Sequence, residues 1–351
     1  MEQAAISERK VTQDAARGIG IILVVYGHLQ RGMLDLGLGA HFDLMRAADF
    51  VLYTTHMPLF FLLAGWNVYA SIGKQGPHAF LRSRPATILW PYFFWSTIFV
   101  LAQQIASTTI AIHHSASLSA IPMEIFKPIG IFWFLYSLFI AQVVAVASSG
   151  RSVLLMTICL LADLMLFEIG PLAPVPVLTQ TLLHLPFFAF GFMAAERQFK
   201  VPYWMRDTAF LAPTLCAAVG LALIASGLGA SWPVSFATIP ASCLGIVAIF
   251  LLAQAITRTK MGAGLAHIGQ QSMGIYVLHI FTLPVFVRIA RFASPEMDGL
   301  TLAIGTGFGV VASVMFCQLL KWSGLDGLLG LSRRPVPLGS LVSRFRQVQA
   351  R

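Results

Sequence analysis

The stretch Ser-Phe-Ala-Thr-Ile-Pro-Ala-Ser-Cys-Leu-Gly-Ile-Val-Ala-Ile-Phe-Leu-Leu-Ala-Gln-Ala-Ile at residues 235–256 contains no charged side chain. A helix needs about 20 predominantly apolar residues to cross the hydrocarbon core of a bilayer. Comparable runs recur along the chain at about 18–34, 50–72, 85–106, 129–148, 152–168, 177–195, 208–227, 271–290 and 299–320. The sequence therefore predicts an all-α, polytopic membrane bundle of about ten transmembrane helices.

The overall composition supports the same class of protein. Of the 351 residues, 57% are hydrophobic and 11% are charged, whereas a soluble domain carries about a quarter charged residues. This balance excludes a cytosolic enzyme, a secreted disulfide scaffold and a disordered chain. The net charge of +9 is typical of cations that flank membrane spans, so we expect a lipid bilayer and no nucleic acid as partner.

The distribution of Lys and Arg predicts the orientation. With the N-terminus inside, 18 of the 23 cations fall in inner segments and 5 in outer ones, so the positive-inside rule places both termini in the cytoplasm. The span at 152–168 is the weakest, because Asp163 and Glu168 interrupt it. We expect residues 1–321 to form a single transmembrane domain and residues 322–351 a basic, mobile cytoplasmic tail.

Polar side chains inside a span are costly unless they are paired or face water, so they are candidate functional residues. Arg17 and His28 are eleven residues apart, which on a helix is about three full turns and about 16 Å of rise. Both side chains therefore point along one stripe, and Asp14 is close enough to pair with Arg17. A buried neutral imidazole can act as a general base, although it can also simply bond to a backbone carbonyl.

A second candidate pair lies in the next span. His56 and Asn67 are again eleven residues apart and share a helix face. His56 is expected near the outer end of the span, where an interfacial histidine without a role is an equally good interpretation.

Two arginines precede the third span in the stretch Arg82-Ser-Arg84-Pro85. A residue before proline favours an extended backbone, in which residues two apart point the same way. The two guanidiniums would then form a fork suited to phosphate. The simpler alternative is that they anchor the protein at the cytoplasmic surface.

Further polar residues line other spans. Ser272, Tyr276 and His279 are spaced to share one face, either to close a polar cavity or to bond neighbouring helices together. Trp133 is expected to serve packing, His184 is interpreted as interfacial, and His113 and His114 are placed in an outer loop. No metal-ligand spacing is present, and the four cysteines lie in apolar runs.

The motifs resemble those of the acyltransferase 3 family of integral membrane acyltransferases, and within it the fucose 4-O-acetylase-like group. The resemblance covers nearly the whole chain and rests on Asp14-Ala-Ala-Arg17-Gly-Ile-Gly to Gly27-His28, His56-Met-Pro-Leu-Phe-Phe, Arg82-Ser-Arg84, Trp133-Phe-Leu, Leu185-Pro-Phe-Phe-Ala-Phe-Gly191 and Ser272-Met-Gly-Ile-Tyr276-Val-Leu-His279. It implies transfer of an acyl group from acyl-CoA to a hydroxyl of a cell-envelope or exported carbohydrate, in the bacterial cytoplasmic (inner) membrane.

Site roles follow from the residues and this resemblance together. We expect His28 and Asp14 to be the catalytic residues, Arg17, Arg82 and Arg84 to bind the donor, and the cavity to be lined by His56, Asn67, Trp133, Ser272, Tyr276 and His279. The donor is expected to be acetyl-CoA, as a substrate, with no bound cofactor and no metal. His28 could serve as a general base or as an acyl relay. A proton-coupled transporter is the alternative function, against which stands the lack of an internal repeat.

Overall fold

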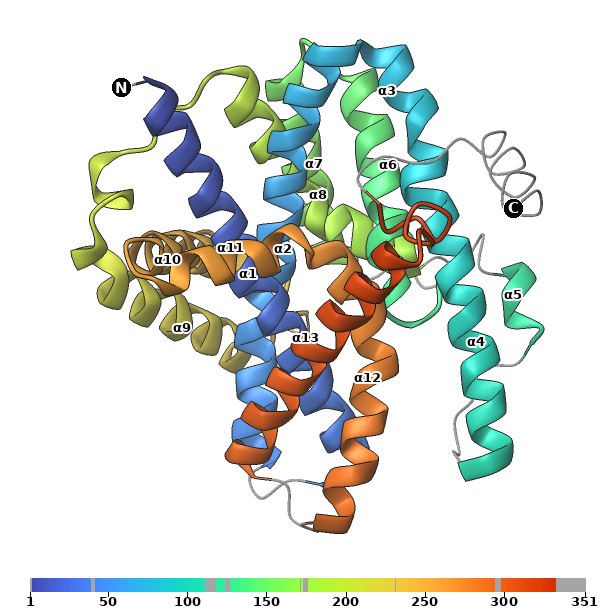
Figure 1. Ribbon diagram of the computed structural model, residues 1–351. Coiled ribbons are helices and arrows are strands. Elements are labelled where there is room, and N and C mark those ends of the chain that lie inside the picture. The colour runs from blue at the N-terminus through green and yellow to red at the C-terminus, as the bar shows by residue number, and fades with distance from the viewer. Residues whose placement is uncertain are drawn as a thin grey trace.

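The structure, a computed structural model, describes residues 2–38, 42–110, 118–123, 127–170, 172, 176–230, 232–293 and 298–332. Within these ranges it contains helices and no β-strand. The helices are α1 (Glu2–Asp35), α2 (Phe42–Gln75), α3 (Pro77–Arg84), α4 (Trp90–Ile110), α5 (Ala120–Met123), α6 (Trp133–Ala147), α7 (Ser152–Ile169), α8 (Pro176–Glu196), α9 (Leu211–Gly227), α10 (Ile239–Thr257), α11 (Met261–Gln270), α12 (Ser272–Ala293) and α13 (Gly299–Trp322) (Figure 1). The predicted His113 and His114 lie outside the described residues.

The polytopic helical bundle is confirmed. Among the described residues, nine helical stretches are long and apolar enough to cross a membrane: Asp43–Gln75, Pro77–Ile105, Gly130–Ala147, Ser152–Ile169, Pro176–Glu196, Thr208–Gly227, Phe236–Thr257, Ser272–Arg291 and Gly299–Trp322. Each overlaps one of the predicted spans. The remaining predicted span, 18–34, lies within α1, which is not among the nine.

Helix α1 differs from the others because it is enclosed. It packs against α2, α10, α12 and α13, and every residue from Thr12 to Leu34 is at least partly buried. A helix that is shielded from lipid by its neighbours can carry polar groups that a lipid-facing helix could not. This position explains why α1 holds Arg17 and His28 in a segment of modest hydrophobicity.

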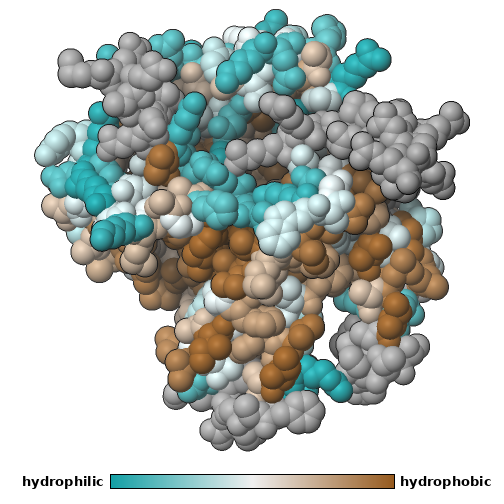
Figure 2. Space-filling model, in the orientation of Figure 1, coloured by the Kyte–Doolittle hydropathy of each residue, from teal (hydrophilic) through white to brown (hydrophobic). Residues whose placement is uncertain are grey.

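The outward faces of other helices are apolar. Along α13, the side chains of Ile304, Phe308, Val311 and Met315 recur at helical spacing and are all exposed. Figure 2 shows hydrophobic surface over the middle and lower parts of this view, with hydrophilic surface across the upper part. An exposed apolar stripe of this kind is a lipid-facing surface.

Two glycines allow α2 and α8 to touch backbone to backbone. A Cβ atom added to Gly65 would lie 2.0 Å from the carbonyl oxygen of Phe188, and one added to Gly191 would lie 2.1 Å from the carbonyl oxygen of Leu62. Small residues at a crossing are the usual means by which membrane helices approach closely. The close approach fixes α2, which carries His56, against the most enclosed helix of the bundle.

The described segment that follows α13 lies against the bundle. Its residues 323–332 fold back onto α4, where the indole N–H groups of Trp90 and Trp95 donate to the carbonyl oxygens of Leu328 (2.7 Å) and Leu329 (2.9 Å). Leu329 also packs against the core. The two tryptophans therefore hold the chain for about ten residues beyond the last span.

Candidate active site

His28 lies in the enclosed part of α1 and is surrounded by aromatic side chains from two other helices. Its ring centroid is 5.1 Å from that of His279 on α12, at an interplanar angle of 40°. It is 6.4 Å from that of Tyr53 on α2, edge to face. The His28 side chain is only partly buried and has no hydrogen bond to any residue that the structure describes. Neither ring nitrogen of His28 is therefore hydrogen-bonded to a described residue. The alternative, a His28 imidazole bonded to a backbone carbonyl, does not occur among these residues.

His279 has one engaged and one unengaged nitrogen. Its Nδ1 lies 3.0 Å from the carbonyl oxygen of Ile275. Because a carbonyl oxygen only accepts, Nδ1 must carry the proton and Nε2 the lone pair of the neutral ring. That Nε2 is buried and has no partner in the described structure. His279 therefore offers an acceptor beside His28 that could fix which nitrogen of His28 holds its proton.

Tyr276 and His279 share a face of α12, as predicted. Their ring centroids are 6.2 Å apart, and the Tyr276 hydroxyl donates to the carbonyl oxygen of Ile131. Ser272, predicted on the same face, begins α12 and is partly buried. It has no hydrogen bond to another described residue. Of the three predicted residues, the structure therefore brings together Tyr276 and His279.

His56 is buried in α2, against the ring of Tyr53. It is 1% exposed, its Nδ1 lies 2.5 Å from the carbonyl oxygen of Leu52, and its ring is 4.6 Å from that of Tyr53. Tyr53 thus lies between the two histidines of α1 and α2. The helical spacing of Tyr53 and His56 could have revealed Tyr53 as part of the site.

Asn67 and Trp133 lie apart from this cluster. The Asn67 amide donates to the carbonyl oxygen of Leu63, one turn earlier in α2. The ring of Trp133 is 5.1 Å from that of His184. His184 is 2% exposed, because α8 is packed on several sides.

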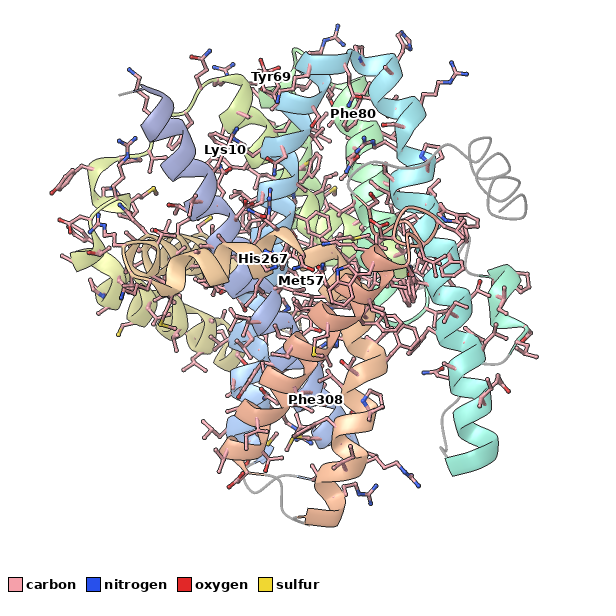
Figure 3. The ribbon with its side chains drawn as sticks, in the orientation of Figure 1. Lys10, Met57, Tyr69, Phe80, His267 and Phe308 are labelled. Carbon is pink, nitrogen blue, oxygen red and sulfur yellow. The ribbon has the colours of Figure 1, made fainter. Side chains whose placement is uncertain are left out.

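The Asp14–Arg17 pair forms as predicted. Arg17 Nη1 donates to Asp14 Oδ1 at 2.9 Å, and the side chains remain 25% and 21% exposed. Helix α11, which the sequence did not predict, lies along α1 at this point, and the Gln270 amide donates to Asp14 Oδ2 at 3.0 Å. In Figure 3, Lys10 marks the upper part of α1 and His267 marks α11, below it.

The stripe from Arg17 to His28 is continuous but packed. Both residues belong to one unbroken helix, as predicted. Ile21 and Val24, which lie between them on that stripe, are 1% and 2% exposed. If the phosphates of a donor bind near Arg17, the rest of the donor must pass to one side of Ile21 and Val24 to reach His28, because these two side chains are packed.

Arg82 and Arg84 do not form the predicted fork, because the backbone is helical and not extended. They lie in the last turn of α3, where residues two apart point about 200° away from each other. Arg82 is exposed, whereas Arg84 lies over the ring of Phe80, with Cζ 4.3 Å from its centroid. The helix passes Pro85 through a π-helical turn, Pro85–Leu89, which accommodates a proline that would otherwise disrupt an α-helix.

The sequence interpretation also missed an ion pair near the end of α1. Arg31 donates to both carboxylate oxygens of Asp49, from Nε at 2.8 Å and from Nη2 at 2.9 Å. The Arg31 Cζ lies 3.4 Å from the centroid of the Tyr53 ring.

In the described ranges, no group of three or more His, Cys, Asp or Glu side chains could hold a metal ion.

Comparison with known proteins supports the motifs. The family model of the acyltransferase 3 domain, described as an acyltransferase domain, matches residues 13–322. The chain is 27% identical over 198 residues to the nodulation protein NolL of Sinorhizobium fredii and 26% identical over 194 residues to NolL of Mesorhizobium japonicum. Each match covers 55% of this chain and 50% of the relative, so the chain spans about half the length of these curated relatives. No solved structure matches.

Proposed function

Because the chain belongs to the acyltransferase 3 family, we propose that it is a membrane O-acyltransferase that moves an acetyl group from cytoplasmic acetyl-CoA to a hydroxyl of a cell-envelope or exported carbohydrate. The observation that carries the proposal is His28, a partly accessible imidazole without a hydrogen bond, held between Tyr53 and His279. An unengaged imidazole inside a membrane bundle is suited to move a proton or an acyl group.

In the direct reaction, His28 acts as general base. The imidazole takes the proton from the acceptor hydroxyl, and the oxygen attacks the carbonyl carbon of the thioester. The bond between carbon and sulfur breaks, and the CoA thiolate leaves and takes the proton from the imidazolium. General base catalysis contributes about 10²–10⁴ in rate.

In the alternative, His28 attacks the thioester itself; the bond between carbon and sulfur breaks, CoA leaves as the thiol with the imidazole proton, and an acyl-imidazole remains. The acceptor hydroxyl then attacks the acyl carbon, and the imidazole leaves and takes the hydroxyl proton. Protein incubated with labelled acetyl-CoA alone separates the two routes. Label that stays on the protein, is released by hydroxylamine and is absent from His28→Ala supports the relay. Direct transfer leaves no such label.

The donor would bind at the end of the bundle that carries the N-terminal cations. Arg17 is partly exposed and oriented by Asp14, and a guanidinium is well suited to bind phosphate. Arg82 is exposed and Arg84 half-buried on α3, and we propose that they contact the donor as separate cations. The positive-inside rule places this end in the cytoplasm, and the bacterial cytoplasmic membrane is the proposed location.

The test uses purified protein in detergent, labelled acetyl-CoA and a glycan fraction from the cell envelope. We expect acceptor-dependent release of free CoA and label in the glycan, both reduced at least 100-fold in His28→Ala. His267→Ala is the matched control, because it removes an exposed imidazole on α11 and should retain activity. Normal transfer by His28→Ala would exclude His28 from the reaction. A carrier would instead move substrate without releasing CoA.

A further inference from the structure

The structure assigns a second role to the end of α1 and the start of α2: we propose that Arg31, Asp49 and Tyr53 form a binding subsite for the neutral, hydroxyl-bearing sugar of the acceptor. This inference rests on the proposed function, because it identifies where the acceptor approaches His28. The three residues lie at the end of α1 opposite Lys10 and Arg17, so donor and acceptor would approach His28 from opposite ends.

The subsite is built from aligned helix faces. Arg31 lies one turn beyond His28 on α1, and Asp49 lies one turn before Tyr53 on α2. The Arg31 guanidinium bonds to Asp49 through two hydrogen bonds and covers the Tyr53 ring at 3.4 Å. The other contacts of that ring are with His28 and His56, at 6.4 Å and 4.6 Å. The cluster thus leads directly to the proposed catalytic imidazole.

Exposure decreases along this series of contacts. The side chain of Arg31 is 38% exposed and that of Asp49 is 19% exposed. Tyr53 and His28 are partly buried, whereas His279, beyond them, is fully buried. A ligand arriving at this end therefore meets the ion pair first and His28 last.

The chemistry of the pair favours a neutral diol. Two of the five guanidinium N–H donors bond to Asp49 and a further one is engaged by the Tyr53 hydroxyl, which leaves two donors, and each carboxylate oxygen keeps a further lone pair. Adjacent sugar hydroxyls, each both donor and acceptor, match this set. The pair has no net charge, so it offers little attraction to a phosphate or a uronate. The double hydrogen bond and the ring contact hold the guanidinium in one orientation before a ligand binds.

An ion pair that only stabilises the packing of α1 against α2 would make the same contacts. The experiment therefore measures sugar binding and the thermal stability of the protein separately. The probes are a neutral methyl glycoside with adjacent hydroxyls, its deoxy analogue, a methyl uronide and inorganic phosphate. Binding to purified protein is followed by saturation-transfer NMR, and the thermal midpoint of each variant is recorded. The wild type should bind the neutral glycoside at least tenfold more tightly than the deoxy analogue and the two anions.

Asp49→Asn gives the sharpest prediction, because it leaves the Arg31 charge uncompensated. The preference should reverse, with at least tenfold weaker binding of the neutral glycoside and stronger binding of the uronide. Exchanging the two residues, Arg31→Asp with Asp49→Arg, restores an ion pair and should restore the thermal midpoint but not glycoside binding. If the exchanged pair restores both the thermal midpoint and glycoside binding, the ion pair only stabilises the packing of α1 against α2. An unchanged ligand preference in Asp49→Asn would lead to the same conclusion. Tighter wild-type binding of uronide or phosphate would also overturn the subsite.

Release of CoA from acetyl-CoA by the wild-type protein in the presence of the envelope glycan separates this inference from the proposed function. If acetyl-CoA is not consumed at all but the glycoside binding pattern holds, the proposed transferase fails while the sugar subsite stands. If acetyl-CoA is consumed and the binding pattern fails, the reverse conclusion applies.

Discussion

The close crossing of α2 and α8 allows the loss of stability caused by Gly65→Ala to be predicted. In Gly65→Ala the new methyl group would lie 2.0 Å from the carbonyl oxygen of Phe188, against an ordinary contact of 3.4 Å or more. The oxygen belongs to the backbone and cannot rotate away, so α2 and α8 must separate by about 1 Å. Overpacking of this kind costs about 1–3 kcal/mol.

Gly73→Ala is the matched control on the same helix. A Cβ at Gly73 meets no atom within 4 Å, so this variant changes only the helix propensity, by up to about 1 kcal/mol in favour of alanine. Because both variants gain a similar propensity term, their difference isolates the packing term. We expect Gly65→Ala to be about 1–3 kcal/mol less stable than Gly73→Ala.

The assay is thermal unfolding of the purified protein in detergent, followed by tryptophan fluorescence, together with acetyl-CoA turnover. Gly65→Ala should unfold at a lower temperature than the wild type and lose activity, since α2 carries Tyr53 and His56. Adding Gly191→Ala should cost less than the sum of the two single changes, because one separation relieves both contacts. If the thermal midpoint of Gly65→Ala equals or exceeds that of Gly73→Ala, the backbone contact at Gly65 does not limit the packing of α2 against α8.

Three further predictions concern the site and a helix end. His279→Phe should lower the rate of acetyl transfer about 10–100-fold with little change in the KM for acetyl-CoA, because it keeps an aromatic ring but removes the acceptor beside His28; an unchanged rate in steady-state assays would exclude this positioning role. Arg84→Ala should raise the KM for acetyl-CoA more than that for the acceptor, and the opposite result would make Arg84 an anchor. Asp298 caps α13 by accepting from the backbone N–H and hydroxyl of Thr301, at 2.9 Å each. These bonds lower the pKa of Asp298, so the cap stabilises the protein above the ordinary carboxyl pKa and is lost as the pH falls through the lowered value. Asp298→Ala should therefore unfold at a lower temperature than the wild type at neutral pH but at the same temperature in acid, and a difference that persists in acid would contradict the capping explanation.

The sequence predicted the spans well because hydrophobic length is a local property. The nine apolar helices overlap predicted segments, since no chain can cross hydrocarbon with its backbone groups unpaired. Helix α11 was missed because its ten residues are too few to span a bilayer. The contact of residues 323–332 with α4 could not be predicted, because it depends on the distant Trp90 and Trp95.

The site was predictable where residues share one helix and less so where they come from several. The Arg17–His28 stripe and the Tyr276–His279 face follow from helical periodicity alone. The contact between His28 and His279 joins α1 to α12, and periodicity carries no information about which helices meet. The prediction for Arg82 and Arg84 was wrong because the π-helical turn at Pro85–Leu89 preserves the helix where proline normally favours extended backbone.

The role of His28 in acetyl transfer is tested by the mass of the envelope or exported glycans from cells that lack this chain and are complemented with the wild type or with His28→Ala. Wild-type complementation should restore one acetyl group per modified unit, whereas His28→Ala, present in the membrane at equal amount, should not. If the glycans are acetylated equally with both proteins, His28 does not carry the transfer.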